Sequence, residues 1–227
     1  MTDGFSIGDT SIGVDEETYI IAEAGINHNG SLQTAKELVD VAAEADANAV
    51  KFQKRRLNST YTKEIAEDPA VAEMGVEYTV SNLKDVMLSD GQFRELAAYC
   101  DKQNIEFLCS PWDNPSLDFL EDLNIPAYKI GSPDMTNFPL LERVLEIGKP
   151  VILSTGMADE TEIERTVEFM QERNAEFALL HCRSTYPAPF HNLNLSFMLE
   201  LDERYDVPVG YSGHERWIAV SEDAAAL

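Results

Sequence analysis

Residues 19–53 read YIIAEAGINHNGSLQTAKELVDVAAEADANAVKFQ, and they contain two apolar runs separated by a helical pattern. The runs Tyr19–Glu23 and Asn48–Gln53 are nearly continuous in hydrophobicity, as in strands buried on both faces. Between them, apolar residues recur at helical spacing: Leu32, Ala35, Leu38, Val39, Ala42 and Ala43. We therefore expect a strand, a helix and a second strand parallel to the first.

The same pattern repeats along the rest of the chain. Further apolar runs of strand length are Ile105–Ser110, Ala127–Gly131, Val151–Ser154, Phe177–Cys182 and Val207–Tyr211. Helical stripes separate them, with Gly148 at a helix end and a capping box of Thr161 and Glu164 at a helix start. Only the segment 54–88 breaks the spacing, and we expect a long loop there.

Repeated strand–helix units predict one α/β domain, residues 1–227, with a parallel sheet. Either a (β/α) barrel or an open doubly wound sheet fits. Seven strands are visible, whereas a closed eight-stranded barrel needs one more.

Composition and charge exclude several classes of protein. With 44% apolar residues, 12 Gly and 10 Pro, the chain is neither disordered nor collagen-like. It has no apolar run of about 18 residues and no secretory signal, so we expect a cytoplasmic protein. The net charge of −24 argues against nucleic acid or anionic membrane as a partner. Dispersed acidic residues with few lysines also predict a halophilic protein that folds better in molar salt.

Cysteine and histidine spacing points to no familiar metal or nucleophile motif. Cys100, Cys109 and Cys182 form no CxxC pair, so we expect buried thiols in a reducing compartment. No two histidines stand at i and i+4, and GxSxG and GxGxxG are absent. His191 and His214 follow predicted strands in polar loops and could share a metal with Glu23.

Two lysines lie inside predicted buried strands, Lys51 in AVKFQ and Lys129 in AYKIG. A lysine is rarely buried without a partner, so each either pairs with a carboxylate such as Glu23 or binds an anion. Serines and glycines follow several strands, where hydroxyl and backbone N–H donors suit an anionic ligand. We expect the residues 54–56 (KRR) to be solvated surface charges.

These motifs resemble the N-acetylneuraminate (sialic acid) synthase family. The resemblance begins in residues 19–53 and continues in FLCSPWD (107–113), YKIGSPD (128–134), VILSTGM (151–157), LHCRSTYPAP (180–189) and VGYSGH (209–214). It covers nearly the whole chain in the same order. The family also includes legionaminate, pseudaminate and spore-coat polysaccharide synthases.

The resemblance implies a (β/α)8 barrel of the TIM type that condenses phosphoenolpyruvate with an N-acetylated amino-sugar aldehyde and releases phosphate. It implies the following roles: Lys51, Lys129, Ser132, Ser154 and Ser184 bind phosphoenolpyruvate, Gln53 and Tyr186 face the substrates, His191 and His214 bind a divalent metal, and Glu23 is catalytic. Mn²⁺ is the expected metal, with Mg²⁺ or Co²⁺ as alternatives.

The resemblance also implies that the chain ends before the eighth strand and before a small C-terminal antifreeze-like domain. We expect a fragment whose full-length form is a homodimer. Two other interpretations stay open at this point. One is another phosphoenolpyruvate or phosphosugar aldolase barrel that works through a Schiff base. The other is a non-catalytic truncated remnant.

Overall fold

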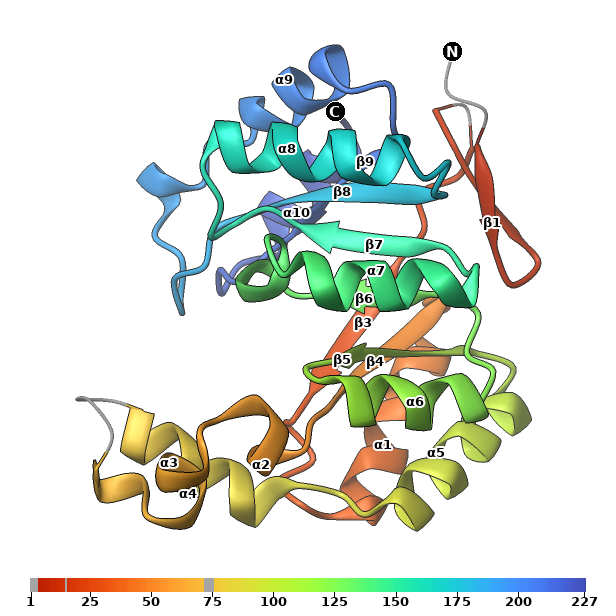
Figure 1. Cartoon of the computed structure of the whole chain (residues 1–227). Coiled ribbons are helices and arrows are strands. Elements are labelled where there is room, and N and C mark those ends of the chain that lie inside the picture. The colour runs from red at the N-terminus through yellow and green to blue at the C-terminus, as the bar shows by residue number, and fades with distance from the viewer. Residues whose placement is uncertain (1–3, 15, 72–75) are drawn as a thin grey trace. The chain divides into compact units, whose positions relative to one another are not determined.

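The computed structural model describes residues 4–14, 16–71 and 76–227. The chain divides into two compact units, one comprising Tyr19–Pro126 and the other Met1–Thr18 with Ala127–Leu227. We name them the β3–β5 unit and the β6–β9 unit after their parallel strands, which Figure 1 labels.

The β3–β5 unit contains three parallel strands in the order β3-β4-β5. Its strands are β3 (Ile21–Gly25), β4 (Ala49–Lys54) and β5 (Glu106–Pro111), and its long helices are α1 (Leu32–Glu44), α5 (Asp90–Gln103) and α6 (Asn114–Asp122). Helix α1 begins where the Ser31 side chain accepts a hydrogen bond from the Thr34 amide. It buries Ala35, Val39 and Ala42 of the predicted apolar stripe, while the other three residues of that stripe are half-buried.

The segment 54–88 is largely helical, so the expectation of a long loop is wrong. It forms α2 (Leu57–Thr60), α3 (Lys63–Glu67), the 3₁₀ turn η1 (Pro69–Val71) and α4 (Val76–Val86). Leu57, Val80 and Leu83 are buried together in a small apolar cluster of their own. Because the first helices have only four or five residues, their apolar period is too short to read from the sequence.

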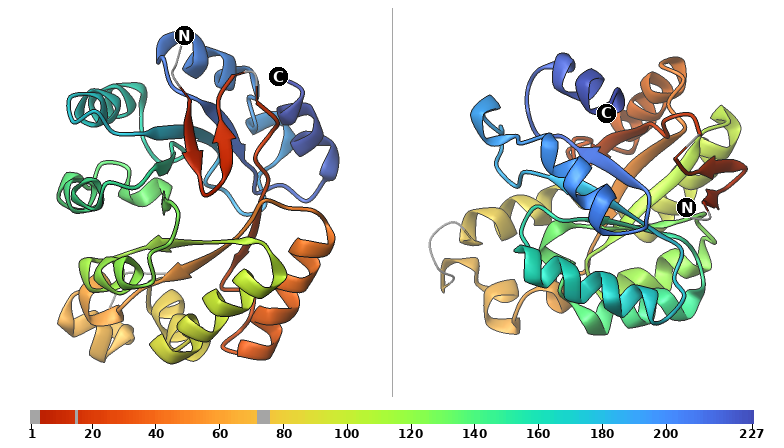
Figure 2. Two further views of the ribbon diagram at one scale, coloured as in Figure 1. Left: turned by 90° about the vertical axis from the view of Figure 1, so that its right-hand side faces the viewer. Right: turned by 90° about the horizontal axis from the view of Figure 1, so that it is seen from above.

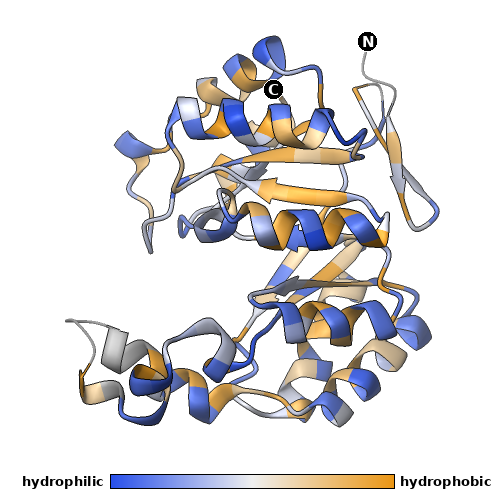
Figure 3. Cartoon of the chain, viewed as in Figure 1, coloured by the Kyte–Doolittle hydropathy of each residue, from blue (hydrophilic) through white to orange (hydrophobic). Residues whose placement is uncertain are grey.

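The β6–β9 unit contains four parallel strands in the order β6-β7-β8-β9. Its strands are β6 (Tyr128–Ile130), β7 (Val151–Ser154), β8 (Phe177–Cys182) and β9 (Val209–Ser212), and its helices are α7 (Phe138–Ile147), α8 (Glu160–Gln171), α9 (Ser196–Arg204) and α10 (Ile218–Ala225), with 3₁₀ turns η2 (Ser132–Asp134) and η3 (Phe190–Asn192). Helices α7 and α8 lie on one face of these strands (Figure 1 and Figure 2). Figure 3 shows β7 and β8 coloured mostly as apolar, while the helices alternate in colour as amphipathic helices do.

Helix ends in this unit test two details of the sequence analysis. Gly148 takes the left-handed conformation after α7, with φ 72°, as predicted. The capping box of α8 consists of Asp159 and Glu162, so its assignment to Thr161 and Glu164 is wrong by two residues. Aspartate caps a helix as readily as threonine does, and the sequence offers both spacings.

A short antiparallel hairpin, β1 (Phe5–Ile7) with β2 (Thr10–Ile12), precedes the parallel strands and was not predicted. Its three-residue strands are too short to show an alternating pattern. Among the described residues, no helix is long and apolar enough to cross a membrane.

Candidate functional site

In the β3–β5 unit, Lys51 forms an ion pair with Glu23 across neighbouring strands. The two residues are direct partners in the parallel register of β3 and β4, and Lys51 Nζ lies 2.5 Å from Glu23 Oε2. Lys51 is buried, and it also donates to Ser110 Oγ at 3.4 Å. A buried ammonium without partners is costly, so Glu23 and Ser110 make this strand lysine tolerable. Its pairing with Glu23 is one of the two alternatives that the sequence left open.

Gly25 lies beside the Glu23 carboxylate at a bulge in β3. The register shifts between Glu23 and Gly25, and Gly25 has a φ of 52°. A Cβ atom at this position would lie 2.9 Å from Glu23 Oε1 and 3.5 Å from Gln53 Nε2. Glycine therefore allows both polar side chains to approach the backbone at the end of the strand.

The three cations that follow Gln53 are not solvated surface charges, so that prediction is wrong. Lys54 is buried, with 3% of its surface exposed, and Arg55 and Arg56 are half-buried. Arg55 donates to Gln53 Oε1 and stacks on the Trp112 ring with its Cζ 4.2 Å from the ring centroid. The sequence does not show the stacking contact, because Trp112 follows the end of β5, far from Arg55 in the chain.

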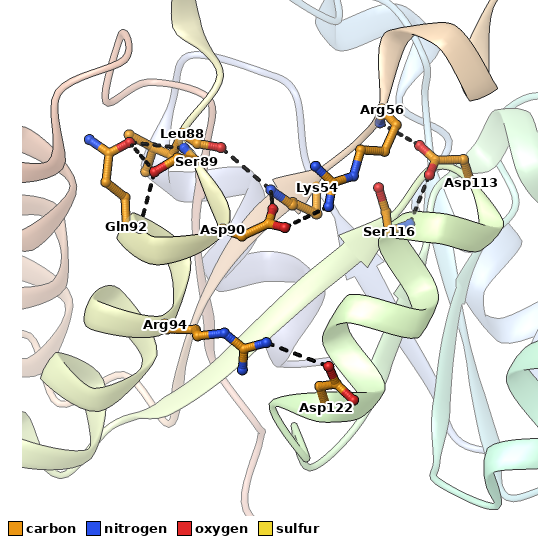
Figure 4. A network of polar contacts seen from close by, with 10 residues as sticks. All are labelled: Lys54, Arg56, Leu88, Ser89, Asp90, Gln92, Arg94, Asp113, Ser116 and Asp122. Carbon is orange, nitrogen blue, oxygen red and sulfur yellow. Dashed lines mark hydrogen bonds and ion pairs between the residues drawn. The ribbon is translucent and has the colours of Figure 1, made fainter.

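Figure 4 shows how Lys54 and Arg56 connect the end of β4 to the start of α5. Lys54 Nζ lies 2.7 Å from Asp90 Oδ1, and an Arg56 guanidinium nitrogen lies 2.6 Å from Asp90 Oδ2. The rings of Phe93 and Phe119 enclose the Lys54 ammonium at 4.5 and 4.9 Å. This network fixes the chain just after Gln53.

In the β6–β9 unit, Lys129 reaches from β6 to the end of β7. Its Nζ atom donates to Ser154 Oγ at 2.5 Å and to the Ile130 carbonyl at 2.8 Å. Lys129 and Ser154 are buried, with 5% and 3% of their surfaces exposed. The structure thus brings together two residues that the sequence placed on separate strands.

Ser132, Cys182 and Ser184 gather near Gly156 at the carboxyl ends of β6, β7 and β8. The Gly156 amide donates to Ser132 Oγ at 3.0 Å, and Ser132 Oγ lies 3.6 Å from Cys182 Sγ. A Cβ atom at Gly156 would lie 2.7 Å from Ser184 Oγ and 2.8 Å from Cys182 Sγ, so a side chain would displace both. Hydroxyl and amide donors at the ends of parallel strands are suited to binding an anion.

Cys182 is the member of this cluster that the sequence analysis did not place in the site. Burial raises the pKa of its thiol, but the hydrogen bonds to His214, Ser132 and Ser184 outweigh burial and lower it to about 7. Burial raises the pKa of Cys100 and of Cys109 to about 12. All three thiols are free and buried as predicted. Lys51, Lys54 and Arg55 also favour the thiolate of Cys109, but there burial outweighs them, whereas at Cys182 the polar neighbours prevail.

His214 and Tyr186 form a stacked pair, with ring centroids 4.0 Å apart. The Tyr186 hydroxyl lies 2.9 Å from His214 Nε2, while His214 Nδ1 lies 2.8 Å from the Arg183 carbonyl oxygen. A carbonyl only accepts, so Nδ1 carries a proton and Nε2 keeps a lone pair in the neutral ring. That arrangement is typical of histidines that bind metals through Nε2.

His191 lies in η3 and is exposed. Nor do three His, Cys, Asp or Glu side chains gather as a metal site in the part of the chain that the structure describes. His214 therefore fits a metal ligand, whereas the described residues do not complete a metal centre.

Comparison with known proteins identifies the family. Residues 38–227 match the NeuB family. The chain is 37% identical to N-acetylneuraminate-9-phosphate synthase of Drosophila melanogaster over 93% of its own length and 58% of that protein. It is also 37% identical to N,N'-diacetyllegionaminic acid synthase of Campylobacter jejuni, over 93% of this chain and 65% of that one. The chain thus spans about three fifths of the length of these relatives.

A solved structure supports the same assignment. The crystal structure of N-acetylneuraminic acid synthetase from Leptospira borgpetersenii matches 99% of this chain and 74% of its own, with a TM-score of 0.89 and 35% identity. This likeness and the seven parallel strands among the described residues confirm the predicted fold class, an incomplete TIM-type (β/α)8 barrel. The motifs, the fold and these relatives together show that the chain belongs to the NeuB family.

Proposed function

We propose that the protein condenses phosphoenolpyruvate with an N-acetylated amino-sugar aldehyde to a nine-carbon 2-keto sugar acid and releases phosphate. The acceptor sugar is N-acetylmannosamine or a 2,4-diacetamido relative. The names of the relatives, N-acetylneuraminate-9-phosphate synthase and N,N'-diacetyllegionaminic acid synthase, support this reaction class. It makes the protein a transferase of carbohydrate biosynthesis.

The observation that carries the proposal is the buried strand lysine Lys129 with its polar partners in the β6–β9 unit. Lys129 lies against Ser154, and Ser132 and Ser184 lie near Gly156 at the same ends of the strands. Phosphoenolpyruvate carries both a phosphate and a carboxylate, so ammonium, hydroxyl and amide donors in a partly buried place would bind it. The resemblance also makes Lys51 a proposed ligand of phosphoenolpyruvate, and in the β3–β5 unit it pairs with Glu23.

The proposed chemistry assigns a distinct task to Glu23. The enol carbon C3 of phosphoenolpyruvate attacks the sugar aldehyde, and C2 becomes cationic. Glu23 then accepts a proton from the water that adds to C2, and the tetrahedral intermediate loses phosphate. Lys51 uses Oε2 of Glu23, and Oε1 faces Gly25, so one carboxylate oxygen is directed away from the lysine.

A divalent metal, Mn²⁺ with Mg²⁺ or Co²⁺ as alternatives, remains part of the proposal. When bound, it would supply a Lewis acid for the aldehyde oxygen. His214 supports a metal because its Nδ1 proton is held by the Arg183 carbonyl. The exposed position of His191 gives no such support. Mn²⁺ titration followed by electron paramagnetic resonance should show weaker binding in His214→Ala, and His191→Ala tests the second proposed ligand.

The function is tested by phosphate release from phosphoenolpyruvate with Mn²⁺ in molar salt, comparing N-acetylmannosamine with a 2,4-diacetamido sugar. The wild-type protein is assayed beside Lys129→Met. Release that depends on one sugar and is lost in Lys129→Met would support the proposal. A lysine adduct trapped by borohydride would instead indicate a Schiff-base aldolase. No release from folded protein would favour a non-catalytic remnant. The homodimer expected from the resemblance stays a prediction, which size-exclusion chromatography can test.

A further inference from the structure

The side-chain amide of Gln53 has an acceptor end and a donor end, and one neighbour decides which end faces which way. Arg55 donates a hydrogen bond to Gln53 Oε1. A guanidinium carries donors only, so the amide atom that faces Arg55 must be the oxygen. We infer that Arg55 is a positioning residue that fixes the Gln53 amide as a hydrogen-bond donor toward the acceptor sugar. This inference rests on the proposed function, in which Gln53 faces the substrates.

The position of Arg55 follows from the register of β4 and β5. Lys54 pairs with Pro111, and the Trp112 amide donates to the Lys54 carbonyl at 3.0 Å, so Arg55 and Trp112 come next on the two chains. The guanidinium stacks 4.2 Å from the Trp112 ring centroid. A planar guanidinium held on an indole face is restricted in orientation, unlike a solvated arginine. Gln53 and Arg55, two residues apart, lie on the same side of the chain.

The donor end of Gln53 faces the Glu23 carboxylate across Gly25. The position of an added Cβ at Gly25 would be 3.5 Å from Gln53 Nε2 and 2.9 Å from Glu23 Oε1. The Gln53 donor and the Glu23 acceptor thus both border the space that a side chain at Gly25 would fill. A hydroxyl group matches this pair, because it donates to Glu23 and accepts from Gln53 at the same time. The arrangement selects a hydroxyl of the sugar rather than of phosphoenolpyruvate, which has none.

Arg55→Met tests the role because methionine keeps an unbranched stem but removes every donor. The amide of Gln53 then loses the contact that fixes its orientation. We expect the KM for the amino sugar to rise about tenfold, equivalent to about 1.4 kcal/mol, while the KM for phosphoenolpyruvate stays unchanged. Arg55→Lys should restore only part of the affinity, because an ammonium also donates only but lacks the planar group that stacks on Trp112. Gln53→Glu should lose sugar affinity even with Arg55 present, because it removes the donor.

Arg94→Met is the matched control, since Arg94 forms an exposed ion pair with Asp122 at 3.5 Å in the same unit. It should leave both KM values unchanged. An Arg55→Met protein whose sugar KM equals that of the wild type overturns the inference. So does a parallel rise of both KM values, because a general structural loss gives that result.

A second measurement separates this inference from the proposed function. The side-chain ¹⁵N–¹H resonances of Gln53, identified with Gln53→Glu, report the orientation of the amide without any turnover. They should shift in Arg55→Met and stay in place in Arg94→Met. Wild-type protein without phosphate release would refute the proposed function alone. Unchanged Gln53 resonances in Arg55→Met would refute the role of Arg55 whatever the activity.

Discussion

The ammonium of Lys129 lies 2.5 Å from the hydroxyl of Ser154, and both side chains are buried. A serine hydroxyl stabilises a buried ammonium without neutralising it. In the proposed function, the ammonium of Lys129 and the hydroxyl of Ser154 bind the anionic phosphoenolpyruvate together.

Lys129→Met should abolish most phosphoenolpyruvate binding, because it removes a positive charge at a buried position. We expect the KM for phosphoenolpyruvate to rise about 100-fold, equivalent to about 2.7 kcal/mol. Ser154→Ala should have a smaller effect, since Lys129 also donates to the Ile130 carbonyl. Steady-state phosphate release measures both, with Lys102→Met at the exposed end of α5 as the control. An unchanged KM in Lys129→Met would contradict the assignment.

Glu23→Gln should separate binding from turnover. The glutamine keeps the size of the side chain but cannot accept a proton from water, so kcat should fall about 100-fold or more. The KM for phosphoenolpyruvate should stay equal or decrease, because Lys51 loses the carboxylate at 2.5 Å that offsets its charge. Glu95→Gln, which removes a surface partner of Lys36, is the control. If kcat fell equally in Glu23→Gln and Glu95→Gln, the catalytic role of Glu23 would be contradicted.

Cys182 should react with iodoacetamide at lower pH than the other two thiols. Only the thiolate is nucleophilic, and its fraction rises as the pH passes a pKa of about 7. The rate of modification should therefore increase up to about pH 8 and then level off, while Cys100 and Cys109, with pKa values of about 12, remain unmodified in folded protein. Mass spectrometry of the peptides identifies the modified residue. Modification of Cys182 with a rate that still rises steeply at pH 9 would contradict the lowered pKa.

Much of the fold was predictable because buried parallel strands have continuous apolar runs. The predicted runs at 151–154 and 177–182 coincide with β7 and β8. The other predicted strands overlap the observed ones with shifts of one or two residues at their ends. The helices α2 and α3 and the β1–β2 hairpin were missed because each is shorter than the window that periodicity needs. The helix α4, with 11 residues, only just fills the smallest such window and was included in the expected loop.

The candidate site was predictable only where a residue is chemically out of place in its own strand. Lys51 and Lys129 stood out for that reason, and Glu23 was predicted as a possible lysine partner, whereas the contact of Lys129 with Ser154 was not predicted. Arg55 gave no such signal, because a cation that follows a strand is normally solvated. The Trp112 ring on which it stacks comes from a distant part of the sequence. His191 was assigned by resemblance, and its role as a ligand stays a prediction, as does halophilic behaviour.

Asp90 connects the stability of the β3–β5 unit to pH. Burial raises the pKa of its carboxyl, but hydrogen bonds and charges from Lys54 and Arg56 outweigh burial and hold it below the ordinary value. A carboxyl with a lowered pKa adds stability above its unfolded pKa of about 4, and that stability is lost as the pH falls through the lowered value. Asp90→Asn should therefore lower the free energy of unfolding at neutral pH, because Lys54 stays buried without its carboxylate.

The difference between wild type and Asp90→Asn should shrink as the pH falls through the lowered pKa, since the wild-type carboxyl then also becomes neutral. Urea unfolding followed by circular dichroism at a series of pH values measures it. Asp122→Asn, which removes an exposed partner of Arg94, should show little difference from wild type at any pH. If the deficit of Asp90→Asn stayed constant down to the most acidic pH at which the protein folds, it would come from packing. In that case Asp90 would not be the acid-sensitive partner of Lys54 and Arg56.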